Sequence, residues 1–339
     1  MACCILPTSE AFAQAQSRNT VLATGSSTVH PFTAAVAQAM APRLLGTPEI
    51  RSTGTVHGFN EFCRGAGLRY PDIQNASRRM TMGEFLLCNR QGVHEIMEIP
   101  IGYDGIVVAF RRDLPAPDIS LGQLWLGIAK EVPRDGRMVA NPYRRWRDIS
   151  PALPDWPIRV IGPPPTSGTR DSFTDLVLLA GCQTQPGIRA IADTAQRRRA
   201  CVTVREDGGW EDGGEDDKVI VRRVAEGEAG TLGVFGDSFL DGNRTRIAPV
   251  RIDGVEPTVE TIASRRYPVA RPLFIYAKRA NLRLVPGLPE FLVEYVSDAA
   301  MGPGGYLARR GLVPLEPARL RRVQDAVRDQ AVMLQAPGG

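Results

Sequence analysis

The apolar residues of this chain occur in short blocks, and the first blocks are followed by small polar residues and then by a helical pattern. Residues 21–23 predict a short buried strand, and residues 24–28 form a turn of Gly, Ser and Thr. Residues 33–40 then show helical spacing behind Pro31. Hydroxyl residues before a proline in the first turn indicate a helix start. The first forty residues therefore predict one strand–turn–helix unit.

The same unit occurs again directly afterwards. Residues 49–52 predict a second strand, residues 53–58 form another turn of small residues, and a helix is expected to begin at Phe59. Residues 71–77 predict a third strand with its turn. Strands that alternate with helices in this way are typical of α/β proteins. We therefore predict an α/β fold.

Two longer apolar segments differ from these units. Residues 101–110 predict a buried strand that leaves a first lobe, and residues 272–277 predict a strand that returns to it. The remaining predicted elements are strands at 159–162 and 231–235, helices at 120–130, 170–179, 289–300 and 315–334, and a loop rich in Gly and acidic residues at 208–217. The chain is thus expected to pass between two lobes.

Length and composition fit such a protein. The chain has 339 residues, which suits two domains better than one. Apolar residues make up 43% and charged residues 23%, so a large buried core is expected. The net charge of +4 suits an anionic ligand but is too small to indicate nucleic-acid binding. The short run from Arg197 to Arg199 is interpreted as a solvated helix face.

The first fifteen residues have some features of a signal peptide. Residues 3–6 form a short apolar segment, and residues 11–13 have the small-x-small form of a signal-peptidase site. The usual basic segment and a full apolar segment are missing. We predict that residues 1–15 are a signal peptide remnant, and the alternative is a disordered N-terminal tail. No apolar stretch is long enough to predict a membrane span.

Four cysteines remain beyond that segment: Cys63, Cys88, Cys182 and Cys201. They permit three pairings. In an oxidising compartment we favour Cys63–Cys88 and Cys182–Cys201, because each pair closes a short loop. Buried free thiols are the alternative. No C-x-x-C or H-x-x-H spacing occurs, so a metal site is not expected.

Three turns of the chain share one design, in which glycine and hydroxyl residues come directly before a helix. They lie at residues 25–32, 52–59 and 165–173. The first turn of a helix has backbone N–H groups without partners and a partial positive charge. Glycine lets an anion approach the backbone, and Ser and Thr add hydroxyl donors. One such turn is often only a helix cap, but three in one chain predict an anion-binding site.

A fourth segment, residues 76–79, follows a predicted strand and contains Ser77, Arg78 and Arg79. An arginine at this place offers two parallel hydrogen bonds to a tetrahedral oxyanion. The alternative is an ordinary surface arginine. The segment is therefore a candidate for the charged part of the same site.

These segments together resemble the phosphate-binding proteins of phosphate ABC importers. The resemblance is carried, in chain order, by GSSTVHPF, STGTVHGFNEFC, PDIQNASRR, NPYRRW, GPPPTSGTRDSF, LGVFGDSF and DGVEPTVETIASRRYPVARPL. It implies a two-lobed type II periplasmic binding protein fold with a hinge of two crossover strands. Lobe 1 would be discontinuous, with residues 21–105 and 275–335, and lobe 2 would comprise residues 106–274.

The resemblance also implies where phosphate is held. Thr28 and the Val29 amide match ligands of the first turn, and Ser27 lies beside them. The other residues that match are Ser52 and Thr55 in the second turn, Ser77 after the third strand, and Ser167, Gly168 and Thr169 in the third turn. All of these groups are hydrogen-bond donors, as an oxyanion requires.

Two positions depart from the pattern of this family. Many members have an arginine four residues before the serine of the third turn, where this chain has Pro163. Many also have a carboxylate directly after the position of Ser77, where this chain has Arg78. We expect Arg78 to be the charged ligand, with Arg170 as the second candidate. The acceptor of the phosphate proton is sought in the acidic residues 215–217.

The resemblance implies capture of inorganic phosphate in the periplasm and delivery to an ABC transporter permease in the inner membrane. No cofactor, catalytic residue or nucleic-acid partner is expected, and the protein is expected to be monomeric. The alternatives are another oxyanion such as sulfate or molybdate, a scaffold or adhesion role, or a hydrolase. The last would use Ser27 or Ser167 with a histidine, although no G-x-S-x-G motif occurs.

Overall fold

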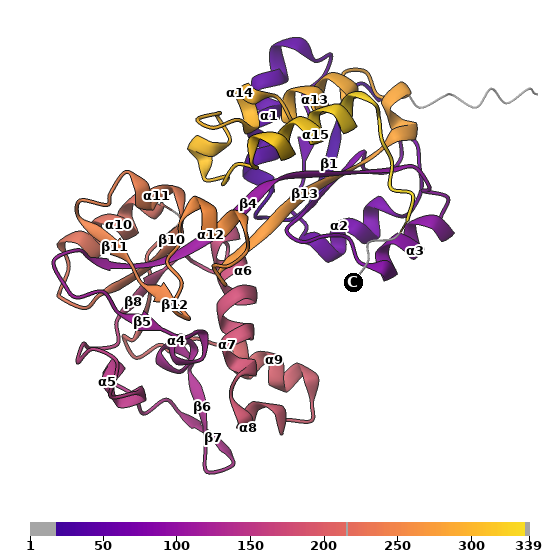
Figure 1. Ribbon diagram of the computed structural model, residues 1–339. Coiled ribbons are helices and arrows are strands. Elements are labelled where there is room, and N and C mark those ends of the chain that lie inside the picture. The colour runs from indigo at the N-terminus through magenta and orange to yellow at the C-terminus, as the bar shows by residue number, and fades with distance from the viewer. Residues whose placement is uncertain (1–17, 215, 336–339) are drawn as a thin grey trace, which may run out of the picture.

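The computed structural model describes residues 18–214 and 216–335, and Figure 1 shows two lobes joined by two long strands. These strands are β4 (Ile96–Arg111) and β13 (Ala270–Lys278), which contain the two segments predicted as crossovers. The signal peptide remnant predicted for residues 1–15 lies outside the described residues. No helix of the described part is long and apolar enough to cross a membrane.

One sheet continues through both lobes. Its strand order is β2-β1-β3-β13-β4-β10-β8-β9, and β11 also pairs with β4. The strands other than β4 and β13 are β1 (Leu22–Gly25), β2 (Glu49–Ile50), β3 (Ile73–Ala76), β5 (Asp118–Ile119), β6 (Glu131–Arg134), β7 (Arg137–Ala140), β8 (Val160–Gly162), β9 (Trp210–Asp212), β10 (Leu232–Gly236), β11 (Ile247–Pro249) and β12 (Arg251–Ile252). Within lobe 1, β1 pairs parallel with both β2 and β3.

The two lobes share β4 because its two halves have different partners. From Ile96 to Gly105 it pairs antiparallel with β13, and from Ile106 to Ala109 it pairs antiparallel with β10. The register between β4 and β13 shifts beside Leu273. The predicted lobe bounds fall inside these two strands, and we use them below to name lobe 1 and lobe 2.

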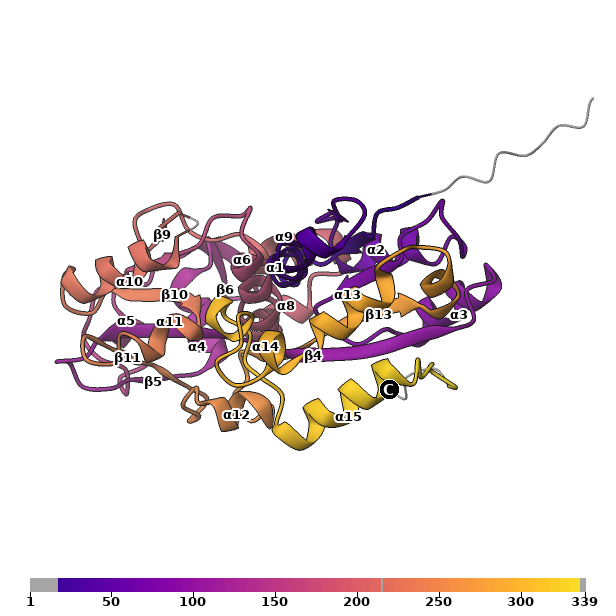
Figure 2. The same ribbon diagram turned by 90° about the horizontal axis from the view of Figure 1, so that it is seen from above.

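Helices pack around the sheet in each lobe, as Figures 1 and 2 show from two directions. The α-helices are α1 (His30–Met40), α2 (Thr55–Phe62), α3 (Met82–Arg90), α4 (Leu121–Ile128), α5 (Trp146–Ile149), α6 (Gly168–Phe173), α7 (Ala180–Gln183), α8 (Pro186–Arg189), α9 (Thr194–Val202), α10 (Asp217–Glu226), α11 (Ser238–Asp241), α12 (Val259–Ala263), α13 (Leu288–Tyr295), α14 (Asp298–Met301) and α15 (Pro317–Arg328). Shorter turns are the 3-10 helices η1 (Ala41–Arg43), η3 (Arg279–Arg283) and η4 (Ala308–Arg310), and the π-helix η2 (Thr174–Leu179), which continues α6.

Several predicted elements differ in extent from the structure, among them the helix predicted at 289–300, which is divided into α13 and α14. The second helix begins at Thr55 rather than Phe59, because Gly54 takes a positive φ of 82° that only glycine adopts easily. The last helix ends at Arg328, and Gln330 beyond it has a φ of 52°. The predicted loop 208–217 contains β9, which pairs with β8.

Both predicted disulfides are present. Cys63–Cys88 joins the end of α2 to α3, and Cys182–Cys201 joins α7 to α9. All four cysteines are buried. The first bond lies in a cluster of buried apolar residues that includes Phe59. The pairing chosen from loop length is therefore confirmed, and the alternative of free thiols is wrong.

A buried carboxylate lies close to the point where β4 enters lobe 2. Asp237 follows β10, is only 6% exposed, and its backbone N–H donates to Gly105 O. No hydrogen bond or ion pair to its carboxylate occurs among the described residues. Burial raises the pKa of Asp237 to about 6, and the nearby charge of Asp241 adds to this effect. The group therefore binds its proton more tightly in the folded protein than in the unfolded chain.

Replacing Asp237 with Asn is expected to make stability less dependent on pH. A raised pKa in the folded state adds stability below the unfolded value of 3.8, and this stability is lost as pH rises towards about 6. Urea unfolding of Asp237→Asn should show a smaller loss across this window and a higher free energy of unfolding above it. Asp325→Asn is the control, because that side chain is 60% exposed, is paired with Arg328 three residues later and does not act on Asp237. Equal pH profiles for the wild type and Asp237→Asn would contradict this prediction.

Candidate functional site

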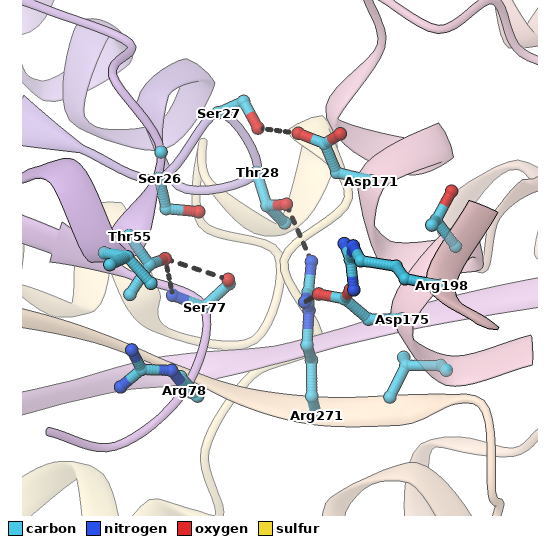
Figure 3. Close-up of a pocket in the computed structure, with 14 residues that line it drawn as sticks. Ser26, Ser27, Thr28, Thr55, Ser77, Arg78, Asp171, Asp175, Arg198 and Arg271 are labelled. Atoms are coloured by element: carbon cyan, nitrogen blue, oxygen red, sulfur yellow. Dashed lines mark hydrogen bonds and ion pairs between the residues drawn. The ribbon is translucent and has the colours of Figure 1, made fainter. Parts of the chain in front are cut away.

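A cavity of about 690 Å³ lies between the lobes. Its lining residues are Ser26, Ser27, Thr28, Gly54, Thr55, Val56, Ser77, Arg78, Asp171, Thr174, Asp175, Leu176, Arg198 and Arg271. The first eight come from lobe 1, the next five from helices of lobe 2, and Arg271 from the crossover strand β13. Figure 3 shows the labelled side chains of both lobes directed toward one another. The predicted turns of lobe 1 thus meet at one place.

The first turn connects β1 to α1. Gly25 has a φ of 120°, and a side chain there would collide with the backbone oxygen of Asn75. This close approach sets the turn against β3 and leaves Ser26, Ser27 and Thr28 at the N-terminus of α1. Thr28 and Val29 are both buried. The Val29 amide points to Ser26 Oγ, 3.4 Å away.

The second turn connects β2 to α2 and is tied to the first. The amides of Thr53 and Gly54 both donate to Gly25 O, at 2.8 Å each. Thr55 Oγ1 accepts the amide of Ser77 at 3.2 Å and lies 3.1 Å from the hydroxyl of Ser77. Two of the predicted hydroxyls therefore meet at the cavity wall. Ser52 is exposed and is not among the lining residues.

The third turn contacts the first turn across the cleft. Ser167 caps α6 by accepting the Thr169 amide at 3.2 Å. A Cβ on Gly168 would lie only 3.0 Å from Thr28 Cα, so glycine permits this approach of the two lobes. Residues 167–169 are not among the lining residues of the cavity. Lobe 2 lines it instead with the following turns, through Asp171 and Asp175 among others.

Arg78 lines the cavity but already has an acidic partner. Its Nη1 and Nη2 donate to the two carboxylate oxygens of Glu84, at 2.9 and 2.7 Å. These hydrogen bonds raise the pKa of Arg78. The side chain is 39% exposed. Arg78 is thus placed where it can reach an anion, and its ligand role stays a prediction.

Arg170 does not lie with the other candidate residues. Its guanidinium stacks over the ring of Trp210, 4.5 Å from the ring centre, and Nη1 donates to Pro163 O at 3.3 Å. Burial lowers the pKa of Arg170. The side chain is packed inside lobe 2 and is not a lining residue.

Arg271 is a functional candidate that the sequence reasoning missed. It is 8% exposed and belongs to β13, where it is the register partner of Asp104 on β4. Figure 3 shows its guanidinium rising between Thr28 and Asp175. A signal was present in the sequence, because Asp104 is the only charged residue inside the predicted crossover 101–110, and Arg271 directly precedes the apolar segment 272–277.

Arg198 was interpreted as part of a solvated helix face, and that interpretation was incomplete. Arg198 is exposed, but it lines the cavity from α9, and Figure 3 shows it beside Asp175. It has no hydrogen bond or ion pair with another described residue. Helix α9 is held in place by the Cys182–Cys201 bond.

Of the acidic residues 215–217, the two that the structure describes, Asp216 and Asp217, do not line the cavity. Asp216 caps α10 by accepting the Lys218 amide, and Asp217 accepts the Gly236 amide. Residue 215 lies outside the described residues. The carboxylates that do line the cavity are Asp171 and Asp175. The hydroxyl of Ser27 donates to the carboxylate of Asp171 across the cleft.

The lining residues do not form the nucleophile and base of a hydrolase. No histidine is among them, and His57 instead lies 3.3 Å from Glu61 on the surface of α2. The described residues also contain no group of three or more His, Cys, Asp or Glu side chains that could hold a metal ion. The arrangement offers hydroxyls, amides and guanidinium groups, which are donors to an anion.

Comparison with known proteins agrees with this chemistry. The chain matches the model of the PBP superfamily domain over residues 10–299. It is 32% identical over 324 residues to the Protein SphX of Synechococcus elongatus, which covers 92% of this chain and 81% of that protein. It is 26% identical to the Phosphate-binding protein PstS of Staphylococcus saprophyticus, over 73% of this chain and 66% of that protein.

Solved structures show the same fold. A protein of Planctomyces limnophilus described as a possible phosphate binding protein has a TM-score of 0.72 and 25% identity, covering 93% of this chain and 100% of that one. An ABC-type phosphate transport receptor of Vibrio cholerae has a TM-score of 0.55 and 18% identity, covering 83% and 95%. The α/β fold is thus the type II fold, as predicted. The chain belongs to the PBP superfamily and, within it, to the family of phosphate-binding proteins, which bind a ligand and are not enzymes.

Proposed function

We propose that this protein binds inorganic phosphate with high affinity in the periplasm and delivers it to the permease of an ABC importer in the inner membrane. One observation carries the proposal. Hydroxyl donors from three segments of lobe 1 line a single cavity, and three guanidinium groups line the same cavity. Relatives and structural neighbours named for phosphate binding and ABC-type phosphate transport support this choice of ligand and partner.

Binding would proceed by closure of the lobes around the anion. In the structure the Ser27 hydroxyl donates to Asp171, and Arg271 donates to Asp175. Both acceptors are carboxylates of lobe 2, and phosphate oxygens would take their place. The long strands β4 and β13 connect the lobes, so small changes in them would move one lobe relative to the other. The closed form would then dock on the permease.

Two carboxylates at the cavity favour phosphate over sulfate. At neutral pH phosphate carries a proton that a carboxylate accepts, whereas sulfate has no proton and would be repelled. Asp171 and Asp175 line the cavity from lobe 2, and either is placed to accept that proton. Molybdate lacks this proton as well. The proposal therefore selects phosphate among the tetrahedral oxyanions.

A periplasmic location fits the two disulfides. Disulfides of this structural kind persist in oxidising compartments and are rare in the cytosol. Residues 11–13, which have the form of a signal-peptidase site, also favour export. We expect a monomer that meets its permease only transiently.

The proposal is tested by a thermal-shift panel of phosphate, arsenate, sulfate and molybdate, followed by calorimetry of the ions that raise the melting temperature. We expect stabilisation by phosphate and arsenate, because a ligand that binds only the folded state raises its stability. Sulfate and molybdate should have little effect. If none of the four ions stabilises the protein, it is not an oxyanion carrier.

Replacing Arg78 with Ala is expected to weaken phosphate binding about tenfold. The side chain lines the cavity, but its exposure and its pairing with Glu84 limit its contribution to roughly 1.4 kcal/mol. Calorimetric titration measures this directly. Arg79→Ala is the matched control, because Arg79 is bound to Glu98 and is not a lining residue. Unchanged affinity in Arg78→Ala would exclude it as a ligand.

A further inference from the structure

Arg271 occupies a position that no other arginine of the cavity shares. It stands on the crossover strand β13, directly opposite Asp104 on the other crossover strand. Its Nε lies 3.6 Å from Asp104 Oδ2. Both strands pass between the lobes, as Figure 1 shows. The guanidinium therefore belongs to the hinge itself rather than to one lobe.

The guanidinium contacts both lobes at once. Its Nη2 donates to Thr28 Oγ1 at 2.9 Å, in the first turn of lobe 1, and to Ser172 Oγ at 2.5 Å, in α6 of lobe 2. Its Nη1 donates to Asp175 Oδ2 at 3.3 Å. Thr28 is also the residue that the family resemblance names as a phosphate ligand. One group thus touches the predicted ligand site, the facing helix and the hinge.

The hydrogen bonds of this guanidinium are incomplete. Arg271 Nε is buried and makes no hydrogen bond. Asp104 Oδ2, which lies 3.6 Å from this Nε, already accepts the Ser172 hydroxyl at 2.6 Å. A buried donor without an acceptor is costly, and an arginine cannot lose its charge to reduce the cost. Such a group at a cavity wall is suited to an additional anionic acceptor.

Other arginines are less suited to carry the charge. Arg170 is packed on Trp210 away from the cavity, and Arg78 holds Glu84 with both terminal nitrogens. Arg198 is exposed at the surface. The position at which many family members have an arginine is Pro163 in this chain. Arg271 is the most buried guanidinium among the lining residues.

We propose that Arg271 is the principal charged ligand of the oxyanion and that it couples anion binding to closure of the lobes. This inference rests on the proposed function. The anion takes the place of the Asp175 carboxylate on the guanidinium and gains the donors of Thr28 at the same time. Because Arg271 also donates to Ser172 of lobe 2, its guanidinium is held beside Thr28 by both lobes, and the anion is held fully only when the lobes are together.

Two variants test this role by calorimetry with inorganic phosphate. Arg271→Gln is expected to lower phosphate affinity about 100-fold, because it removes the charged donor from a buried site. Arg271→Gln with Asp104→Asn removes both members of the pair, so that no buried charge is left alone to disturb folding. This double variant should show the same loss of phosphate affinity as Arg271→Gln. Arg279→Gln is the control, because Arg279 pairs with Glu95 at the surface beyond the end of β13.

Closure is measured separately by small-angle X-ray scattering with and without saturating phosphate. The wild type should contract when phosphate is added, and Arg271→Gln should contract less even at saturation. Phosphate affinity in both Arg271 variants equal to that of the wild type would overturn the proposal. If the wild type binds sulfate or molybdate but not phosphate, the proposed function fails, yet Arg271→Gln must still lose that anion. If the wild type binds none of these ions, both proposals fail.

Discussion

Replacing Thr28 with Val should lower the affinity for inorganic phosphate about 30-fold, which corresponds to roughly 2 kcal/mol. Valine keeps the shape of the side chain but removes the hydroxyl. That hydroxyl accepts from Arg271 Nη2 and lies at the cavity wall at the start of α1. Hydrogen bonds to charged groups typically contribute about 1.5 to 3 kcal/mol, so this single change has a large expected effect. Isothermal titration calorimetry measures it.

Thr28→Ser is the matched control for this experiment. Serine keeps the hydroxyl and loses only a methyl group, so phosphate affinity should stay within a few-fold of the wild type. A loss in Thr28→Ser as large as in Thr28→Val would mean that the methyl contact, rather than the hydroxyl, is what matters. Wild-type affinity in Thr28→Val would show that the first turn does not bind the anion through this group.

Removing the disulfide between Cys63 and Cys88 should lower the free energy of unfolding by about 3 kcal/mol. The bond closes a loop with a sequence separation of 25 and so restricts the unfolded chain. Alanine is chosen at both positions because the sulfur atoms lie among buried apolar side chains, where a hydroxyl would lack a partner. Urea unfolding of the double variant, compared with the oxidised wild type, gives the difference.

A reduction experiment provides the control. The reduced wild type should be less stable than the double variant, because reduction also opens Cys182–Cys201. Phosphate affinity of the folded double variant should be unchanged, since neither cysteine lines the cavity. A wild type whose unfolding is insensitive to reductant would contradict a structural role for these bonds.

The arrangement of the site suggests how capture and release are balanced. Two donors at the cavity already have acceptors in the structure, because Ser27 of lobe 1 and Arg271 of the hinge donate to carboxylates of lobe 2. Under the proposed function, phosphate would compete with these internal acceptors, so its net binding energy would be smaller than the sum of its hydrogen bonds. A carrier that passes its cargo to a permease benefits from such a limit, because release must also occur.

Local sequence was sufficient for the elements that build the site. The turn at residues 25–32 was predicted from glycine and hydroxyl residues before a helix, and the structure has that turn, with α1 starting at His30. The crossover strands were predicted from strongly apolar segments, and β4 and β13 contain them. These signals act between residues close together in the chain, so they can be read without knowledge of the fold.

The family's motifs were sufficient to predict the family, and the disulfides followed from loop length. Both depend on order and spacing along the chain. The pairing of Cys63 with Cys88 and of Cys182 with Cys201 was chosen on that basis alone and is confirmed. The strand β9 was missed, because its three residues pair with a strand about fifty residues earlier and have little local pattern of their own.

The tertiary structure decided which charged side chains reach the cavity. Arg170 and Asp171 are neighbours in the chain, but α6 turns the first into the core of lobe 2 and the second to the cavity. In the same way, α9 turns Arg198 to the cavity, although the whole run of arginines had been expected to face solvent. Successive residues of a helix point about 100° apart around its axis. The sequence does not say which side of the helix faces the other lobe.

The position of Arg271 at the cavity depended on the tertiary structure most of all. Its partner Asp104 is distant in the chain and is brought opposite it only by the register of two strands. Its contacts with Thr28 and Ser172 require the two lobes to meet at the hinge. The sequence by itself therefore determined the fold class, the donor turns and the disulfides, because these are local patterns. Only the packing of the lobes decided which arginines reach the cavity, because long-range contacts hold a guanidinium beside the other donors.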